Sequence, residues 1–328
     1  MSQHFLENIK IENFKCFENL EINDFKRVNV FGGKNNVGKT ALLEAIELLT
    51  KSGNPNSLAH NAYLFLKRRQ PNSECVEFDA FGSSIDGRFL IKSSRKKVGM
   101  SLSLDGQQLT FQVDEQTAIV DNLWLCGRKG YKEDTSSKNN NFINSCTLDE
   151  VIISILYGHV VEAGQEGFLN KSLTEFDSDI VSFKVIPTEK GIKPKIKTSK
   201  LESNKLVSLS VFGDGLNRYI SIFCAIWASQ NGFLFIDEIE NGIHYSNYKE
   251  LWKLIFMASE QANCQVFVTT HSKECITVFN EVQQERNDDA GRYFELFKSP
   301  KKQRIMAAIR DAEQLQYALE NDKEIRGE

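Results

Sequence analysis

The chain has 328 residues, of which 41% are hydrophobic and 26% are charged, and its formal net charge is −4 at pH 7. This balance is typical of a globular protein with a sizeable core, and the length predicts one large domain with insertions or two lobes. The net negative charge argues against a surface made mainly of nucleic-acid contacts, although a local basic stripe stays compatible with it.

The cysteines and the apolar runs bear on the cellular location that we expect for the protein. The seven cysteines form no CxxC pair, which argues against a zinc site and fits reduced thiols in a cytoplasm. The first residues carry no basic segment followed by an apolar run, so no secretory signal is expected. No stretch approaches about 18 uninterrupted apolar residues, so we expect no membrane span and a cytoplasmic location.

In the N-terminal third, alternating apolar residues predict short strands in IKIENFKCF and NLEIND, followed by an apolar strand in VNVFGG. A helix is expected over residues 40–50, because its leucines and isoleucine recur on one face. Alternation returns over residues 77–113 and predicts an antiparallel sheet with a hairpin turn at Asp105-Gly106. Residues 133–141 are polar and irregular, which favours an exposed loop.

The rest of the chain alternates between helical and strand patterns, and no internal repeat is visible. We expect a helical segment at about 147–175, a lysine-rich hairpin at 179–200, helices at 216–229, 245–261 and 311–321, and strands at 232–237, 265–270, 293–298 and 303–309. The predicted organisation is an N-terminal lobe (1–115), an insertion with a loop, helical segment and hairpin (116–200), and a C-terminal lobe (201–328).

A phosphate-binding pattern follows the third predicted strand. Residues 33–40 read GKNNVGKT and match G-x4-G-K-[ST] between a strand and a helix, which is the context of a P-loop. The glycines let backbone N–H groups surround phosphate oxygens. Lys39 would reach the β- and γ-phosphates, and the Thr40 hydroxyl would ligate Mg²⁺. The alternative is a Gly-rich turn with an incidental lysine, which the context disfavours. The expected nucleotide-binding residues are Gly33, Lys34, Asn35, Asn36, Val37, Gly38, Lys39, Thr40 and Ala41.

A buried strand, FLFI, ends in two carboxylates, Asp237 and Glu238. Asp237 can hold Mg²⁺ through water, and Glu238 can polarise the attacking water. On its own, such a strand would more often end in acids that are merely solvated. With a P-loop in the same chain, we interpret the pair as metal-binding and catalytic.

Two further segments suggest more phosphate contacts. SVFGDGLNR, residues 210–218, places a Gly-rich turn before a buried helix, and a helix N-terminus of this kind can bind an anion. His271 follows the strand QVFVTT, where its imidazole could touch a γ-phosphate. A lone histidine after a strand is more often structural, but its spacing after the acidic strand favours a functional role.

Taken in order, the P-loop, the S-x-x-G-D-G-x-x-R turn, IDEIENGIH and VTTHS resemble the ABC-type ATPases of the SMC and RecF kind. The resemblance is greatest to the short OLD-like (overcoming lysogenisation defect) ATPases of prokaryotic defence systems, including the ATPase components of PARIS- and Septu-type systems. It covers roughly residues 1–60 and 205–325. It implies an α/β P-loop NTPase, an ABC-type ATPase head with an antiparallel β lobe, a short helical insertion and no long coiled coil.

The resemblance implies roles for individual residues. Glu238 and His271 would be catalytic, Thr40 and Asp237 would hold Mg²⁺, and Lys15 would lie near the nucleotide. In such ATPases a Gly-rich turn of one subunit contacts the γ-phosphate held by the other, so that ATP joins two copies. The residues that would do so here are Ser210, Gly213, Asp214, Gly215 and Arg218.

The sequence also departs from the family. Phe212 stands where the signature serine is usual, and no convincing glutamine loop is found. The long arms of SMC proteins are missing. The chain ends about sixty residues after His271, so we expect no C-terminal nuclease domain of the kind that full OLD proteins carry.

Two functions from different classes stay open. The first is an ATPase, active as a homodimer or larger assembly, that regulates a separate effector, a nuclease or toxin from a neighbouring gene, in anti-phage defence. The second is a RecF-like DNA-binding ATPase in repair, which needs a basic face. A charge run is more often a solvated face than a binding site. A transporter subunit is the weakest alternative. The candidate DNA-binding stripe is Lys190, Lys193, Lys195, Lys197 and Lys200.

Overall fold

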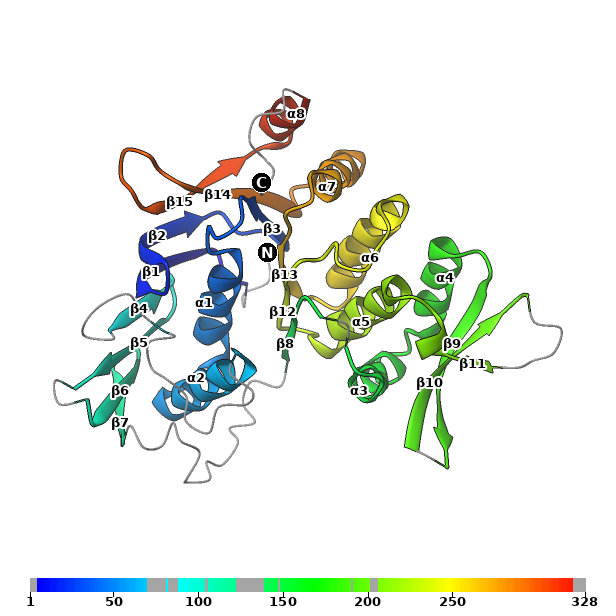
Figure 1. Cartoon of the computed structure of the whole chain (residues 1–328), viewed down its shortest axis with the longest axis horizontal. Helices are drawn as coiled ribbons and strands as arrows, with labels where there is room; N and C mark the ends of the chain where they lie inside the picture. The colour runs from blue at the N-terminus through cyan, green and yellow to red at the C-terminus, as the bar shows by residue number, and fades with distance from the viewer. Residues whose placement is uncertain are drawn as a thin grey trace.

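The computed structural model describes residues 5–69, 81, 88–103, 106–121, 139–146, 148–189, 191–200 and 206–320. At its centre is a six-stranded sheet in the order β15-β14-β3-β13-β12-β8 (Figure 1). All of its strands are parallel except the edge strand β15. The strands are β3 (Val28–Gly33), β8 (Asn140–Ile143), β12 (Phe233–Ile236), β13 (Gln265–Thr269), β14 (Gly291–Lys298) and β15 (Ile305–Arg310).

Both faces of this sheet are buried, as expected for parallel strands covered by other elements. Along β12, Leu234 and Ile236 belong to one hydrophobic cluster and Phe235 to a second one, because side chains alternate between the faces. Phe267 of the neighbouring strand joins the cluster of Phe235. The apolar runs in the sequence therefore fill two cores, one on each side of the sheet.

Helices cover the first face (Figure 1). These are α5 (Asp214–Ala228), α6 (Tyr248–Gln261), α7 (Lys273–Arg286) and α8 (Ala312–Glu320), with the short helices η4 (Leu209–Val211) and η5 (Tyr245–Asn247) before α5 and α6. The helical segment expected at 147–175 forms two helices, α3 (Glu150–Glu162) and α4 (Glu166–Phe176), which pack on α5 and α6. Beyond them lies a three-stranded antiparallel sheet of β9 (Ile180–Thr188), β10 (Gly191–Thr198) and β11 (Leu206–Ser208).

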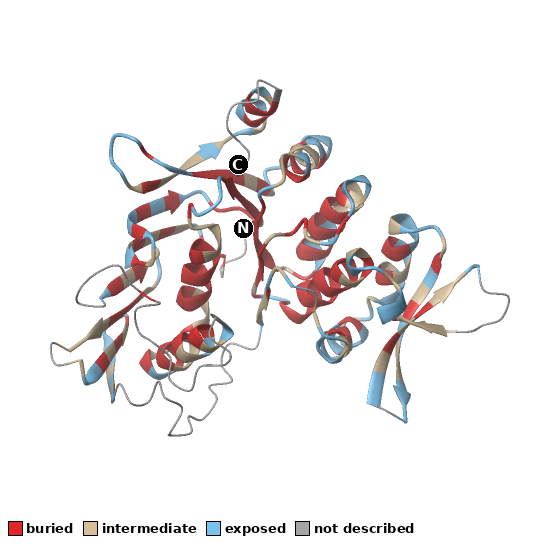
Figure 2. Cartoon of the chain, in the orientation of Figure 1, coloured by how far each residue is buried: buried red, intermediate tan, exposed pale blue. Residues whose placement is uncertain are grey.

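The second face is covered by α1 (Lys39–Lys51) and α2 (Pro55–Arg69) and by a second, antiparallel sheet. Its order is β2-β1-β4-β5-β6-β7, with β1 (Asn8–Phe14), β2 (Phe17–Asn23), β4 (Phe89–Lys92), β5 (Lys97–Leu102), β6 (Gln108–Val113) and β7 (Gln116–Asp121). Residues 41–49 of α1 are all buried, so this helix is enclosed on every side (Figure 2). Phe14, Phe17 and Phe31 are at most 1% exposed within this core.

The α/β fold and the antiparallel lobe are confirmed. The longest described helices, α2 and α5, have 15 residues each, so no long coiled coil occurs in the described part of the chain. Within that same part, none of the helices is both long and apolar enough to cross a membrane. Asp105 of the predicted hairpin and residues 133–138 of the predicted loop lie outside the described residues.

One expectation needs correction, and one helix was not expected. Residues 140 and 141, predicted as loop, begin strand β8, because their backbone pairs with β12 and Asn140 and Asn141 hydrogen-bond through their side chains to Phe233 N and Ser229 Oγ. Helix α2 was not predicted. Its start carries a reciprocal cap, since Ser57 N donates to Asn54 Oδ1 and Asn54 N donates to Ser57 Oγ.

Candidate nucleotide site

The P-loop connects β3 to α1 through two glycines with positive φ, Gly33 at 134° and Gly38 at 87°. A Cβ at Gly38 would lie 2.5 Å from Cys16 Sγ, and one at Gly33 would lie 2.2 Å from the Leu296 carbonyl oxygen. Only glycine fits these two positions, both for its backbone and for the space beside it. The loop therefore has the backbone shape in which N–H groups can surround an anion.

Lys39 lies at the start of α1, and its ammonium donates to the carbonyls of Gly33 at 2.8 Å and Lys34 at 3.0 Å. Burial lowers the pKa of Lys39, while the charges of Glu240, Glu238 and Asp237 act in the opposite direction. Lys39 is thus held inside the loop as a partly desolvated cation, which strengthens its interaction with a phosphate.

A cleft of about 730 Å³, which we call the nucleotide cleft, opens over the P-loop. It brings together predicted residues that lie more than 200 positions apart in the chain, such as Lys39 and His271. Val37 is buried at the base of the loop, while Lys34 is exposed. The residues that line the cleft are Lys15, Cys16, Asn35, Asn36, Gly38, Lys39, Thr40, Ala41, Glu238 and His271.

Asp237 lies just past the end of β12 and accepts hydrogen bonds from two threonines. Thr40 Oγ1 donates to its carboxylate at 3.0 Å, and Thr269 Oγ1 donates at 2.6 Å. Burial raises the pKa of Asp237, although both hydroxyls lower it. No cluster of three or more His, Cys, Asp or Glu poised for a metal occurs among the described residues. A hydroxyl and one carboxylate fit Mg²⁺, which keeps waters and takes its other ligands from phosphates.

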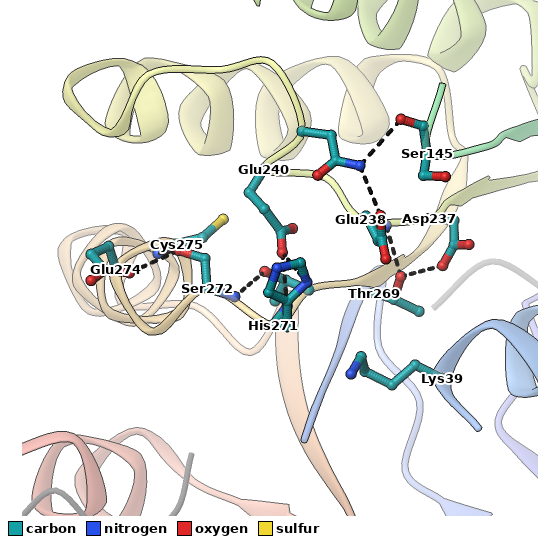
Figure 3. Close-up of polar contacts among 12 residues, drawn as sticks. Lys39, Ser145, Asp237, Glu238, Glu240, Thr269, His271, Ser272, Glu274 and Cys275 are labelled. Atoms are coloured by element: carbon teal, nitrogen blue, oxygen red, sulfur yellow. Dashed lines mark hydrogen bonds and ion pairs between the residues drawn. The ribbon is translucent and has the colours of Figure 1, made fainter. Parts of the chain in front are cut away.

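Glu238 lines the cleft in a left-handed backbone conformation, with φ of 49° (Figure 3). Its backbone N–H donates to Thr269 Oγ1 at 2.9 Å, and its Oε2 accepts from the Asn241 amide at 2.8 Å. A non-glycine residue in this region is uncommon and is often found at functional sites. The backbone of Glu238 is therefore fixed by the hydrogen bond that it donates to Thr269, and its carboxylate by the one that it accepts from Asn241.

His271 follows β13, and its ring is held by Glu240 (Figure 3). Glu240 Oε1 accepts from the His271 backbone N–H at 2.8 Å and lies 2.9 Å from Nδ1. Sequence reasoning missed Glu240, Thr269 and Asn241 as supporting residues. The acid at the end of I-D-E-I-E was the available signal for Glu240, but a loop leaves the direction of its side chain undetermined.

Lys15 lies between two strands of the lobe sheet, β1 and β2, and lines the cleft. Its ammonium pairs with the buried carboxylate of Glu44 on α1 and lies 4.1 Å from the Phe65 ring centroid. Phe14 and Phe17 flank it in the core, and Phe31 is also buried. These three rings are core residues, so they do not offer a face for stacking on a base.

The signature turn, residues 210–215, lies outside the cleft of its own chain. Ser210, Gly213 and Asp214 are exposed, while Phe212 packs against the helix-side core. Gly215 lies against Gly242, since a Cβ there would be 2.6 Å from the Gly242 carbonyl oxygen. Arg218 differs from the rest, because its side chain is only 2% exposed and lies inside its own chain.

The predicted lysine stripe is partly neutralised. Lys193 pairs with Glu150 at 3.1 Å, and Lys200 pairs with Asp179. Lys190 lies outside the described residues. Alternate lysines of β10 do share one side of the strand, as predicted.

Comparison with known proteins identifies the family. The family model described as the AAA ATPase domain matches residues 5–166 and 132–276. The chain belongs to this family. It is therefore a nucleotide-binding ATPase, as the P-loop and the acidic pair predicted.

Individual relatives extend the comparison. The ATP/GTP phosphatase of Helicobacter pylori (strain ATCC 700392 / 26695) is 28% identical and aligns over 98% of this chain and 100% of that protein. The DNA replication and repair protein RecF of Exiguobacterium sp. is 28% identical over 35% of this chain and 28% of that protein.

Solved structures confirm the fold of an SMC head. An Smc head bound to the C-terminal winged-helix domain of ScpA has a TM-score of 0.57 at 13% identity, with 95% of this chain and 99% of that chain covered. An Smc head with an extended coiled coil, bound to the C-terminal domain of ScpA from Pyrococcus furiosus, has a TM-score of 0.53 at 11% identity, with 97% and 99% covered.

Proposed function

We propose that this ATPase is a nucleotide-driven switch in which ATP joins two copies of the chain. The main observation is the separation of two phosphate-binding elements. The P-loop, Glu238 and His271 line one cleft, whereas the exposed signature turn lies outside it. A turn of this kind could complete the site only on a second copy, with Ser210, Gly213, Asp214 and Gly215 toward the partner's γ-phosphate.

Within one copy, we assign a separate role in binding and hydrolysis to each residue of the cleft. The P-loop N–H groups and Lys39 would bind the β- and γ-phosphates, and Thr40 with Asp237 would hold Mg²⁺, which neutralises charge on the phosphates. Glu238 would orient the attacking water, with its own carboxylate held by Asn241. His271, whose Nδ1 is engaged by Glu240, would offer Nε2 to the γ-phosphate.

The resemblance of the motifs to short OLD-like ATPases supports a finer proposal. The switch would regulate a separate effector, a nuclease or toxin, in prokaryotic anti-phage defence. Joining and release would follow from the higher affinity of ATP for the joined state, and hydrolysis through Glu238 would reset it.

A RecF-like DNA-binding ATPase is the second candidate, and the match to RecF proteins over about a third of the chain supports it. The pairing of Lys193 with Glu150 weakens it, because a paired lysine contributes less to phosphate binding. DNA affinity measured from 50 to 300 mM salt separates the two candidates. A steep loss of affinity with salt favours DNA binding, and no measurable binding rejects it.

The H. pylori relative is named an ATP/GTP phosphatase, so we asked which nucleotide bases this chain accepts. We propose that this chain hydrolyses ATP and also accepts GTP. Steady-state hydrolysis of both nucleotides tests this, with Lys39→Ala as the inactive control. A preference for ATP of about a hundredfold or more would mean that a base-specific contact exists.

The joined state is tested with Glu238→Gln, which should block hydrolysis and keep binding. Its mass is measured by light scattering with and without Mg-ATP, and Glu238→Gln combined with Lys39→Ala is the matched control. A mass that doubles only with ATP, and only with Lys39 present, supports the shared site. A mass that ATP does not change contradicts it.

A further inference from the structure

Arg218 makes an unusual set of contacts for a buried arginine. Its guanidinium donates only to backbone carbonyls, and no ion pair to a carboxylate is formed within the described residues. Nη2 donates to the carbonyls of Asp237 at 2.6 Å and Glu238 at 3.1 Å. Nη1 donates to the carbonyls of Asn144 and Cys146, the latter at 3.3 Å.

These four carbonyls come from two separate segments beside the catalytic carboxylate. Asp237 and Glu238 follow β12, and residues 144–146 follow the neighbouring parallel strand β8. The two segments are also joined directly, because the backbone N–H of Asp237 donates to the Ile143 carbonyl at 2.9 Å. Arg218 thus links the segments that follow two adjacent strands, β8 and β12. It does so at Glu238, the residue in the left-handed conformation.

A flexible or solvated arginine could not hold this geometry. Arg218 is 2% exposed, so each of its carbonyl bonds forms in a medium where water does not compete for it. A planar guanidinium with five donors can satisfy several carbonyls at once, whereas a lysine ammonium has three donors around a single atom. The site is therefore specific for arginine.

Arg218 also lies one turn into α5, the helix that begins at the signature turn. A second connection runs parallel to it. Gly215 packs on the Gly242 carbonyl. The neighbouring Asn241 donates to Glu238 Oε2 at 2.8 Å and to the Ser145 carbonyl at 3.2 Å. Both connections link the signature turn to the catalytic carboxylate of the same chain.

We propose that Arg218 is a positioning residue that acts in its own chain: it holds the backbone of Glu238 and couples it to the signature turn. This replaces the trans phosphate contact expected from the sequence. The coupling part of the proposal rests on the shared site proposed above, while the positioning of Glu238 does not. Arg218 then determines the rate of hydrolysis and leaves the affinity for nucleotide unchanged.

The first test compares Arg218→Lys and Arg218→Met with the wild type. The expected result is a fall in kcat of about 30-fold or more, with the Kd of a fluorescent ATP analogue changed less than about threefold. Arg286→Lys is the matched control, because Arg286 forms surface ion pairs with Glu260 and Asp288. An unchanged kcat, or parallel losses of kcat and nucleotide affinity, would overturn the proposal.

Should neither Arg218 variant fold, as judged by circular dichroism, Asn241→Ala tests the second connection. It removes the amide bond to Glu238 Oε2 and leaves the buried arginine in place. A loss of kcat with preserved nucleotide affinity supports coupling of the signature turn to Glu238. Wild-type kcat in this variant would contradict it.

A mixing experiment distinguishes action within one chain from action on the partner. Arg218→Lys is mixed with Glu238→Gln in the presence of Mg-ATP. If Arg218 acted on the partner's nucleotide, mixed dimers would contain one intact site and recover about a quarter of wild-type activity. If Arg218 acts in its own chain, as proposed, each site of the mixed dimer carries one defect and no activity returns.

A third variant tests the shared site independently of Arg218, so that a failure of the shared site can be told from a failure of the Arg218 proposal. Gly213→Asp adds a negative charge to the exposed turn, where a Cβ meets nothing within 4 Å. Mixed with Glu238→Gln, it should regain activity if the turn acts on the partner. If this control stays inactive, the shared site is wrong, and the kcat and Kd of the Arg218 variants alone decide the positioning role.

Discussion

Glu240 holds His271 at two points, since one carboxylate oxygen accepts the backbone N–H at 2.8 Å and lies 2.9 Å from ring Nδ1. Glu240 is 8% exposed, and its other oxygen, Oε2, is buried without a hydrogen-bond partner. The carboxylate therefore fixes both the loop after β13 and the orientation of the imidazole that lines the cleft.

Replacing Glu240 by glutamine should lower kcat roughly tenfold or more, because a neutral amide oxygen holds the ring more weakly than the charged carboxylate does. Nucleotide affinity should change little, since the P-loop is untouched. Glu274→Gln is the matched control, because Glu274 is exposed and accepts a hydrogen bond from Ser272 Oγ, not from His271. Equal kcat values for the two variants would show that Glu240 does not position His271.

Gly38→Ala should abolish nucleotide binding. The substitution places a Cβ at 2.5 Å from Cys16 Sγ in a backbone with φ of 87°, so the loop must move. Gly164→Ala is the control, because its φ is 67° and nothing lies within 4 Å of a Cβ there. Both variants carry a backbone cost of roughly 1–2 kcal/mol, but only Gly38→Ala should lose binding of a fluorescent ATP analogue. Retained binding would contradict this.

The central sheet and most helices were predictable because their apolar patterns are long and regular. Strand β8 was not, since it is short and begins with Asn140 and Asn141, which look like a loop. Its strand character comes from pairing with β12, which lies about 90 residues later in the chain. A local pattern holds no information about such a partner.

In the site, too, features tied to a local pattern were predictable and features that depend on tertiary contacts were not. The P-loop, the acidic pair and His271 could be found because each has a spacing tied to one strand or helix end. Thr269 and Glu240 could not, because their roles depend on contacts between loops of different strands. The direction of the Arg218 side chain likewise depends on tertiary packing, so the family resemblance alone implied a contact with a partner's nucleotide.

Glu47 should be a main anchor between α1 and α2. Glu47 is 4% exposed, and its carboxylate bonds to Arg68 at 2.9 Å and to Lys51 at 2.7 Å. Burial opposes ionisation, but these two cations hold the pKa of Glu47 below its ordinary value. Glu47→Gln should therefore lower the free energy of unfolding at pH 7 by about 2 kcal/mol, the scale of a hydrogen bond to a charged group.

The ion pairs of Glu47 also predict how the stability of the fold depends on pH. Because the pKa of Glu47 is lower in the folded chain, its stabilisation is complete above the unfolded value of about 4.3 and is lost as pH falls through the folded value. The deficit of Glu47→Gln should thus shrink in acid. Urea unfolding from pH 7 to pH 3 measures it, with the surface variant Glu285→Gln as control. A deficit independent of pH would contradict the ion-pair account.

Asp237 is expected to reduce the stability of the nucleotide-free fold. Burial raises the pKa of Asp237, so the folded chain disfavours the carboxylate that a metal requires. By linkage, the stability that Asp237 contributes is fully present below its unfolded pKa of about 3.9 and is lost as pH rises through the folded value. Asp237→Asn should therefore unfold at a higher temperature than the wild type at pH 7, with the difference vanishing toward pH 3.

Asp237→Ala provides the contrast, because it removes the acceptor that Thr40 and Thr269 share. Leaving those hydroxyls without a partner should place its unfolding temperature below that of Asp237→Asn. Both variants should lose hydrolysis, since neither can hold Mg²⁺ as a carboxylate does. Melting in EDTA across this pH range is the measurement. A less stable Asp237→Asn at pH 7 would mean that the two hydroxyls fully compensate the buried charge.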